Sequence, residues 1–374
     1  MKKVAGLFAG IGGLELGLHR AGFVSTMMCE IDRSAQHVLR AQFPGVEIVS
    51  DVRAVDQVRS ADVLCAGFPC QDLSSVGQKS GIGGRQSSLV EEVFRILAQN
   101  EIDWVVVENV KFMLHLNKGE AMTRVVEGFE KLGYRWAYRV VNSLAFGVPQ
   151  RRHRVFFVAS KTGDPREVLL SDDFGAPAEH DEIPSLDDHI GFYWTEGAYA
   201  AGLSRNSIPP LKAGSTIGIP SPPAILFPHG LVGTPDLRDA ERMQGFDADW
   251  TLPAEECGRA SLRWRLLGNA VTVPVAEWVG ERLQLPQPYD SSQDLPLKGK
   301  WPAAAWSMGN GRYEAKCTEW PRGQQLVHIG DFLRYEPKAL SERATKGFLS
   351  RAFKGNLKFP PGFLDALTSH MKRL

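Results

Sequence analysis

Short apolar runs alternate with helix-like segments along the first 160 residues of the chain. Six of these runs have the length and valine content of buried strands: 4–8, 24–29, 46–49, 63–66, 104–107 and 155–159. Strands that alternate with helical segments are typical of an α/β fold, in which a mostly parallel sheet has helices on its faces. Ligands bind such sheets beyond the carboxyl ends of the strands, so the turns there are the candidate site.

The first three strand ends carry residue types that suit a nucleoside-containing cofactor. The turn from Phe8 to Gly13 is rich in glycine and precedes an amphipathic helix, so its backbone can approach a ligand at the helix N-terminus. The second strand ends in Glu30-Ile31-Asp32, where a carboxylate can accept hydrogen bonds from ribose hydroxyls. The third ends at Asp51. The glycine-rich turn taken alone also suits tight packing or a nicotinamide enzyme on the same type of sheet.

The fourth strand leads into Gly67-Phe68-Pro69-Cys70-Gln71, and a glycine- and serine-rich stretch follows. Such a stretch suits either a lid over a substrate or a disordered surface loop. A lone cysteine near a loop is more often inert than reactive, so Cys70 depends on its neighbours. The fifth strand delivers Glu108, a candidate acid. Arg152 and Arg154 alternate in an extended segment, which places both guanidinium groups on one face.

Taken in order, these segments resemble the DNA (cytosine-5)-methyltransferase family. The resemblance spans about residues 3 to 285 and includes two late motifs, 238–246 and 268–271. It implies a Rossmann-like methyltransferase fold with a smaller irregular target-recognition domain, followed here by a C-terminal extension. It also implies methyl transfer from S-adenosyl-L-methionine to C5 of a flipped cytosine in a specific double-stranded DNA sequence, with S-adenosyl-L-homocysteine as product.

The resemblance assigns roles to individual residues. Cys70 would add to C6 of the base, Glu108 would act at N3, Arg154 would hold the base carbonyl, and Arg152 would help fix the geometry of the site. The segment 71–88 would close over the DNA once the base is flipped out of the duplex. Flipping the base costs a few kcal/mol. The implied cofactor positions are Phe8, Gly10, Gly12, Glu30, Ile31, Asp51, Val52, Gly67, Pro69, Leu89, Asn269 and Val271.

Residues 161–236 stand where the family keeps its target-recognition region. Within them, 171–190 contains seven Asp and Glu and no Lys or Arg, so we expect a solvated linker that avoids phosphates. The candidate DNA contacts have side chains that can donate to phosphates or base edges: Gln71, Ser74, Arg85, Arg205, Asn206 and Lys212.

The chain continues well beyond the last shared motif. From 298 to 374 it has fourteen Lys and Arg against six Asp and Glu, although the whole chain is neutral. Trp301, Trp306 and Trp320 lie among these charges. Basic residues interleaved with aromatics suit nucleic acid, so this extension is a candidate grip on the DNA backbone. The alternative is that the tryptophans cap the core, because tryptophan is usually buried.

These observations predict four segments. They are a catalytic and cofactor-binding domain at 1–160, the target-recognition region at 161–236, late motifs returning to the catalytic domain at 237–286, and the C-terminal extension at 287–374.

Composition narrows the remaining classes of protein to which the chain can belong. No apolar run approaches the roughly 20 residues of a membrane span, and the N-terminal stretch does not resemble a secretory signal, so we expect a cytoplasmic protein that joins the nucleoid when bound to DNA. The five cysteines form no Cys-x-x-Cys pair and have no histidine at metal spacing, so no metal site is indicated. The expected partner is double-stranded DNA, with a cognate restriction or defence system left open and no obligate protein partner evident.

Two other functions remain open at this stage. A transfer RNA (cytosine-5)-methyltransferase would use the same chemistry, but its recognition segments carry a Cys-Phe-Thr signature, which does not occur here. A non-catalytic DNA-binding regulator on a methyltransferase scaffold would not need Cys70, Glu108 and Asn269, all of which the chain retains.

Overall fold

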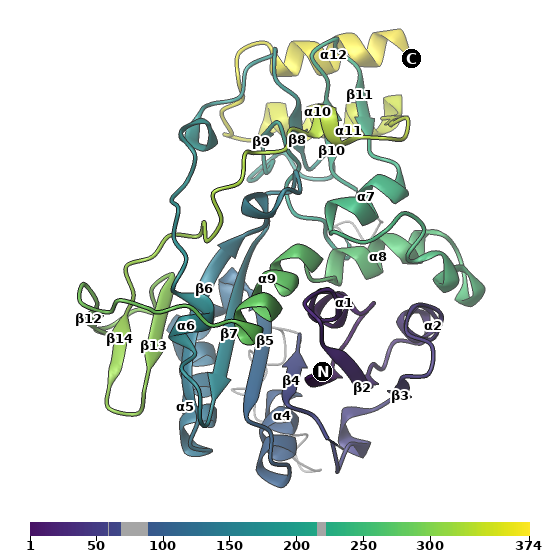
Figure 1. Ribbon diagram of the computed structural model, residues 1–374. Coiled ribbons are helices and arrows are strands. Elements are labelled where there is room, and N and C mark those ends of the chain that lie inside the picture. The colour runs from purple at the N-terminus through teal and green to yellow at the C-terminus, as the bar shows by residue number, and fades with distance from the viewer. Residues whose placement is uncertain (59, 69–88, 215–221) are drawn as a thin grey trace, which may run out of the picture. The chain divides into compact units, whose positions relative to one another are not determined.

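The computed structural model describes residues 1–58, 60–68, 89–214 and 222–374 (Figure 1). The chain divides into two compact units. Unit 1 comprises 1–142, 153–175 and 271–323, and unit 2 comprises 143–152, 176–270 and 324–374. Both the late motifs and the C-terminal extension are therefore shared between the two units. Within the described ranges, no helix combines the length and apolar character needed to cross a membrane.

Unit 1 is built on a ten-stranded sheet. The strands in spatial order are β12 (Leu295–Pro296), β14 (Arg312–Glu314), β13 (Ala304–Ser307), β6 (Arg135–Asn142), β7 (His153–Ser160), β5 (Trp104–Val110), β4 (Val63–Ala66), β1 (Lys3–Leu7), β2 (Val24–Cys29) and β3 (Glu47–Val49). The five strands from β5 to β3 run parallel, and the strands from β7 to β12 pair antiparallel. The predicted α/β fold is confirmed.

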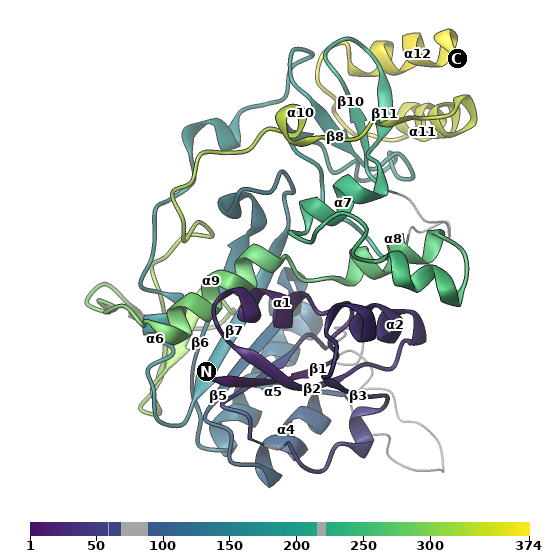
Figure 2. The same cartoon turned by 45° about the vertical axis from the view of Figure 1, so that its right-hand side comes forward.

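Helices cover both faces of this sheet (Figure 2). On one face, α4 (Leu89–Gln99) and α5 (Glu120–Lys131) pack on the main apolar core. On the other, α1 (Gly13–Arg20) crosses α9 (Val273–Gln284) so closely that a Cβ on Gly17 would lie 2.5 Å from the Cβ of Ala276. The late helix α9 is thereby held against the first helix of the chain. The other helices in the described residues of unit 1 are α2 (Arg33–Gln42) and α6 (Arg166–Leu169), with short 3-10 turns at Val52–Ala54, Lys111–Leu114 and Leu116–Gly119.

The search for apolar runs does not predict β6, because a charged residue interrupts its pattern. Trp136, Tyr138 and Val140 alternate toward the main core, whereas Arg139 on the other face is fully buried. Its guanidinium donates to the carbonyl oxygens of Thr318 (2.7 Å) and Leu169 (3.1 Å) and binds the carboxylate of Asp173 (2.9 Å). These partners compensate the buried charge and join distant segments to the sheet.

The three tryptophans of the C-terminal segment are buried in unit 1. Trp301 packs edge-on against two aromatic rings of β6 and donates its indole N–H to the Gly119 carbonyl at 3.2 Å. Trp306 lies in β13, which pairs with β6, and Trp320 is also buried. The burial of these three side chains favours the alternative that the tryptophans cap the core over contact with DNA.

Unit 2 contains a five-stranded antiparallel sheet in the order β15 (Lys338–Ala339), β11 (Val232–Thr234), β10 (Ala224–Leu226), β8 (Ile190–Phe192) and β9 (Ser204–Arg205). Helices α11 (Glu342–Lys354) and α12 (Phe363–Arg373) pack beside it (Figure 2). In the apolar cluster that packs on this sheet, half of the buried residues come from after Gln324, and they include Phe348 and Phe363. Residues 324–374 are therefore part of the fold of the recognition unit. Its other helices are α7 (Leu237–Met243), α8 (Ser261–Asn269) and α10 (Ile329–Phe332), with 3-10 turns at Ser143–Phe146, Ala178–Asp181 and Leu252–Cys257.

Glu15 is a carboxyl group buried between α1 and the sheet of unit 1. Its Oε1 accepts a hydrogen bond from the Cys65 thiol at 3.5 Å. A Cβ on Gly6 would lie 1.9 Å from the same oxygen, so glycine in β1 makes the room that this carboxyl needs. Burial raises the pKa of Glu15 to about 7, which means that the neutral form is favoured inside the protein.

We expect Glu15→Gln to flatten the pH dependence of stability. Because the pKa of Glu15 is raised on folding, its contribution is complete below about pH 4.5 and is lost as the pH rises through about 7. The variant should therefore gain up to about 3 kcal/mol in the free energy of unfolding at pH 8, relative to wild type, and little at pH 4. Urea unfolding at both pH values measures this difference, with Glu47→Gln at an exposed position as the control. Parallel pH profiles of wild type and Glu15→Gln would contradict the assignment.

Candidate active site

The carboxyl ends of β1 and β2 are tied together by a carboxylate. The backbone N–H of Gly10 donates to Oε2 of Glu30 at 2.7 Å, and the N–H of Asp32 donates to Oε1 at the same distance. Burial raises the pKa of Glu30, while these backbone donors oppose the shift. The carboxylate predicted to bind a ribose is thus held at the strand end, with its position fixed by the glycine turn.

The turn between β1 and α1 adopts left-handed backbone at alternate residues. Phe8 has φ +55°, Gly10 +57° and Gly12 +82°. A Cβ on Gly12 would lie 2.4 Å from the ring of Phe43, so only glycine fits there, whereas a Cβ on Gly10 would meet no atom within 4 Å. The turn therefore leaves open space beside Gly10, at the N-terminus of α1, where a ligand can approach the backbone.

The other predicted cofactor residues differ in their exposure. Ile31 is 71% exposed at the end of β2, which leaves an apolar surface beside Glu30. Asp51 accepts a hydrogen bond from the N–H of Arg53 at 3.0 Å, while the side chain of Val52 is buried. Leu89 begins α4. Val271 is buried in unit 1, and Asn269 is exposed at the end of α8 in unit 2.

Glu108 and Arg154 form an ion pair on adjacent antiparallel strands. Arg154 Nε lies 3.0 Å from Glu108 Oε1, and both side chains are largely buried. In the register, Glu108 of β5 is opposite Phe156 and Arg154 of β7 is opposite Val110, so the pair is diagonal across the two strands. Gly67, at the end of β4, borders the same place, because a Cβ there would lie 3.8 Å from Glu108 Oε2. Two predicted catalytic residues and one predicted cofactor residue therefore meet in unit 1.

Arg152 is placed differently from Arg154. It belongs to unit 2, where its buried guanidinium donates to the carbonyl oxygens of Leu211 (3.0 Å), Gly268 (3.2 Å) and Ala270 (2.7 Å). These bonds tie Arg152 to Leu211 and to the late motif at 268–270, so Arg152 acts as a positioning residue within its unit. The sequence predicts that Arg152 and Arg154 offer their guanidinium groups together to an anion. In the structure, the Nη1 and Nη2 groups of Arg152 instead donate to backbone carbonyls.

Gln150 is a further buried residue, to which the sequence assigns no role of its own. Its Nε2 donates to the Met243 carbonyl at 3.0 Å, and its Oε1 accepts from the N–H of Leu211 at 2.9 Å. Gln150 stands two residues before Arg152 in the sequence, but no local pattern identifies its hydrogen-bond partners.

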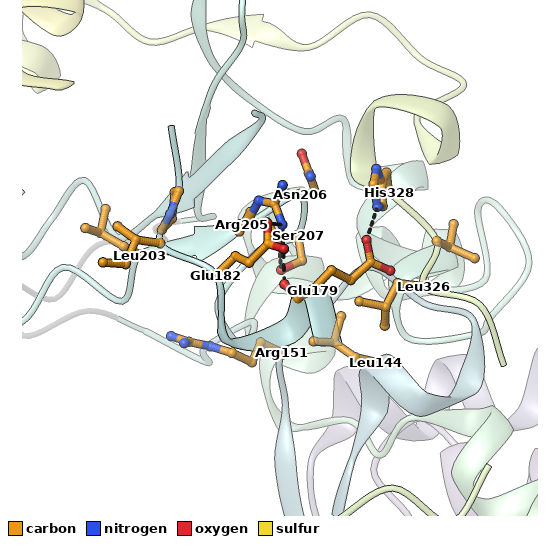
Figure 3. Close-up of a pocket in the computed structure, with 13 residues that line it drawn as sticks. Leu144, Arg151, Glu179, Glu182, Leu203, Arg205, Asn206, Ser207, Leu326 and His328 are labelled. Carbon is orange, nitrogen blue, oxygen red and sulfur yellow. Dashed lines mark hydrogen bonds and ion pairs between the residues drawn. The ribbon is translucent and has the colours of Figure 1, made fainter. Parts of the chain in front are cut away.

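The predicted DNA contacts of unit 2 are engaged with acidic groups. Arg205 and Asn206 line a cavity of about 310 Å³ (Figure 3). Arg205 binds the carboxylates of Glu182 (2.6 Å) and Asp188 (3.0 Å), and Asn206 Nδ2 donates to Asp188 at 3.0 Å. Lys212 is paired with a glutamate and lies over the ring of Tyr193, at 3.6 Å from its centroid.

Five predicted site residues lie outside the described residues. They are the cysteine expected to be the nucleophile, its preceding proline and three candidate DNA contacts: Pro69, Cys70, Gln71, Ser74 and Arg85. Their roles stay predictions.

A family model and a curated protein are similar to this chain, the curated protein over nearly its whole length. A family model described as C-5 cytosine-specific DNA methylase matches residues 2–202. The Type II methyltransferase M2.BsuMI of Bacillus subtilis (strain 168) is 44% identical over 378 residues, which cover 98% of this chain and 97% of that protein. The chain belongs to the C-5 cytosine-specific DNA methylase family. It is therefore a DNA (cytosine-5)-methyltransferase, and methyltransferases of this family use S-adenosyl-L-methionine.

More distant relatives agree with this family assignment. The Type II methyltransferase M.Bsp6I of Bacillus sp. (strain RFL6) is 28% identical over 320 residues, which cover 76% of this methylase and 98% of that protein. Among solved structures, the Dnmt2 methyltransferase of S. pombe matches with a TM-score of 0.56 at 14% identity, covering 76% of this chain and 99% of that one. This last likeness shows a shared fold.

Asn109 is a residue of the methylase site that sequence reasoning did not single out. It is buried directly after Glu108 in β5, and its Nδ2 donates to the carbonyl of Phe68 at 3.0 Å. Phe68 is the last described residue before Pro69 and Cys70. The side chain of Asn109 thus fixes the backbone from which the predicted nucleophile extends.

We expect Asn109→Ala to lower kcat about 10- to 100-fold while the Kd for S-adenosylmethionine changes little. The reason is that releasing Phe68 lets the following residues shift, and small displacements of reacting groups are costly. Single-turnover methylation and cofactor titration measure the two quantities. Asn100→Ala is the matched control, because Asn100 also bonds backbone groups of unit 1, Val58 and Ile96, but at another loop. Equal losses of kcat in both variants would contradict a specific role.

Proposed function

We propose that this methylase transfers the methyl group of S-adenosylmethionine to C5 of a cytosine flipped out of double-stranded DNA, through a covalent bond between Cys70 and C6 of the base. The observation that carries the proposal is the Glu108–Arg154 ion pair at the end of β5. The pair lies beside Gly67, which precedes Cys70 by three residues in the chain. The family assignment supports the reaction type.

The strand ends fit the cofactor. The open space beside Gly10, the fixed carboxylate of Glu30 and the exposed Ile31 offer a backbone cradle, a ribose acceptor and an apolar surface for an adenine ring. Bound S-adenosylmethionine supplies an electrophilic methyl group on a sulfonium. We propose the remaining predicted cofactor residues as secondary contacts of this site, with Asn269 and Val271 contributed by the late motif.

The residues of the chain divide the chemistry among them. The Cys70 thiolate forms a bond to C6, and the electron pair of the C5–C6 double bond becomes available at C5. Glu108 donates a proton or hydrogen bond at N3 as negative charge develops there, and Arg154 holds both the glutamate and the base carbonyl. Methyl transfer to C5 would leave S-adenosyl-L-homocysteine as the product. The C5 proton would then be lost to water, the electrons of that C–H bond would restore the C5–C6 double bond, and the electrons of the C6–S bond would leave with the Cys70 thiolate, which releases 5-methylcytosine.

Covalent trapping tests this proposal. DNA containing 5-fluorocytosine blocks the final proton loss, so wild type with cofactor should form a stable protein–DNA adduct, and Cys70→Ala should form none. Cys257→Ala removes an exposed free cysteine and should trap like wild type. Adducts only on 5-fluorocytosine RNA would favour the transfer RNA enzyme, and no adduct on either nucleic acid would favour the non-catalytic regulator.

The recognition unit supplies the remaining candidates for DNA contact. On binding DNA, Arg205 and Lys212 would exchange their carboxylate partners for phosphates or base edges. Arg151 lines the same cavity as Arg205 but forms no ion pair with any described residue, so it would have no carboxylate partner to exchange. We also propose that the methylase is the modification component of a restriction system in the bacterial cytoplasm, as the names of its Type II relatives suggest. Sequencing 5-methylcytosine in DNA from expressing cells identifies the target site.

A further inference from the structure

Helix α11 has a buried face and a charged face. Thr345, Phe348, Leu349 and Ala352 are buried in unit 2. The opposite side of the helix carries three exposed cations, Arg343, Lys346 and Lys354. Their spacing of three and eight residues, with the exposed Ser350 between the last two, places them along one stripe of the helix. We call the three cations the α11 basic face.

Among the described residues, the cations of the α11 basic face have no ion-pair partner, unlike several other cations of unit 2. Arg205, Lys212 and Arg263 each bind carboxylates. In the described part of the chain, by contrast, no ion pair involves any of the three cations of the α11 basic face. The nearby acid on the helix is Glu342, which lies in the first turn, where it complements the helix dipole. From 338 to 374 there are eight Lys and Arg and two Asp and Glu.

We propose that the α11 basic face is a contact surface for the DNA backbone, separate from the residues that read or flip the target base. This inference rests on the proposed DNA substrate and concerns where the recognition unit grips it. The occupant follows from charge complementarity, because DNA is a polyanion and the three cations form no ion pair with any described residue.

The dimensions of the helix suit this occupant. Lys354 lies eleven positions after Arg343, which corresponds to about 16 Å along an α-helix. Along one DNA strand, charges recur about every 3.4 Å, so the stripe can follow a strand over about five nucleotides. Phe353, which is 67% exposed beside Lys354, adds an aromatic surface next to the cations. Phosphate contacts of this kind position a protein and carry no sequence information of their own.

Point substitutions are the appropriate test, because removing the C-terminal segment would also remove half of the buried residues in the apolar cluster on the sheet of unit 2. Arg343→Ala, Lys346→Ala and Lys354→Ala, combined in one variant, change exposed side chains and leave the buried face of α11 intact. The matched control combines Lys131→Ala, Lys298→Ala and Lys300→Ala, which removes the same charge from exposed positions in unit 1.

Binding to a 30-base-pair duplex is measured by fluorescence anisotropy between 50 and 300 mM salt. For the α11 variant we expect the Kd to rise roughly 10- to 100-fold at 100 mM salt and the slope of log K against log salt to become shallower by about 2 to 3. The loss should be equal on target and non-target DNA. kcat at saturating DNA should stay at the wild-type value.

Three outcomes would overturn the inference. They are an unchanged salt slope, an equal change in the unit 1 control, and a change of oligomeric state in place of DNA affinity, which would assign the surface to a protein partner. Trapping on 5-fluorocytosine DNA separates this failure from that of the proposed function. If wild type forms adducts and the α11 variant keeps the wild-type salt slope, only the inference about α11 fails.

Discussion

Glu108→Gln is expected to slow methylation by about 100- to 10,000-fold, the range that loss of a general acid produces. The amide keeps nearly the same shape and can still lie beside Arg154 at the end of β5. It cannot give up a proton, so the negative charge that forms on the base when Cys70 adds is stabilised less well. Single-turnover methylation of a duplex with the target site measures the rate, and DNA and cofactor titrations should give Kd values close to wild type.

The Arg312–Glu130 pair offers a control for Glu108→Gln. Glu130 on α5 binds Arg312 at 2.6 Å and also accepts a hydrogen bond from the Trp136 indole at 3.0 Å. Glu130→Gln therefore disrupts an ion pair of the same kind in the same unit, without touching the end of β5. A rate near wild type for Glu108→Gln, or equal losses in both variants, would show that Glu108 does not act as the acid.

The chemistry at the strand ends could be predicted because its signals are local. A glycine turn, a following acidic residue and a polar strand end each occupy a few consecutive residues, and parallel strands bring their carboxyl ends to one edge. Glu30 bonded to Gly10, and Glu108 near Gly67, are consequences of that rule. The sequence does not reveal the direction of β7, whose antiparallel pairing puts Arg154 beside β5.

The sequence does not predict contacts between segments that are far apart in the chain. The carbonyl partners of Arg152 stand 59 to 118 residues away in the chain, and no periodicity identifies them. The same holds for the C-terminal segment, whose helices look like an independent basic extension until their apolar faces are seen in the core of unit 2. Local amphipathicity predicts that a face is buried but not what buries it.

The acidic stretch from 171 to 190 shows the same limit for charges. Its composition suggested a solvated linker, but Asp172 accepts hydrogen bonds from Arg282 (2.7 Å) and the Trp278 indole (3.0 Å), and Asp173 binds the buried Arg139. Asp188 binds Arg205 in unit 2. These carboxylates hold segments together, so the expectation of a purely solvated linker is wrong. A charge count measures the long-range field, whereas individual ion pairs depend on geometry.

Phe348→Ala is expected to destabilise unit 2 by about 3 to 5 kcal/mol, the usual cost of truncating a fully buried phenylalanine. Its ring centroid lies 5.0 Å from that of Phe192 in β8 and 6.4 Å from that of Phe363 in α12. The side chain thus joins the recognition sheet to both C-terminal helices. Urea unfolding followed by far-UV circular dichroism should show an earlier transition for this variant.

Phe353→Ala is the matched control for this stability prediction. Phe353 lies on the same helix but is 67% exposed, so its removal should change the free energy of unfolding by no more than about 0.5 kcal/mol. If α11 were an appendage rather than part of the recognition core, Phe348→Ala would also unfold like wild type. A large difference in the free energy of unfolding between the Phe348→Ala and Phe353→Ala variants would instead show that the residues beyond the shared motifs complete the fold of the recognition unit of this methylase.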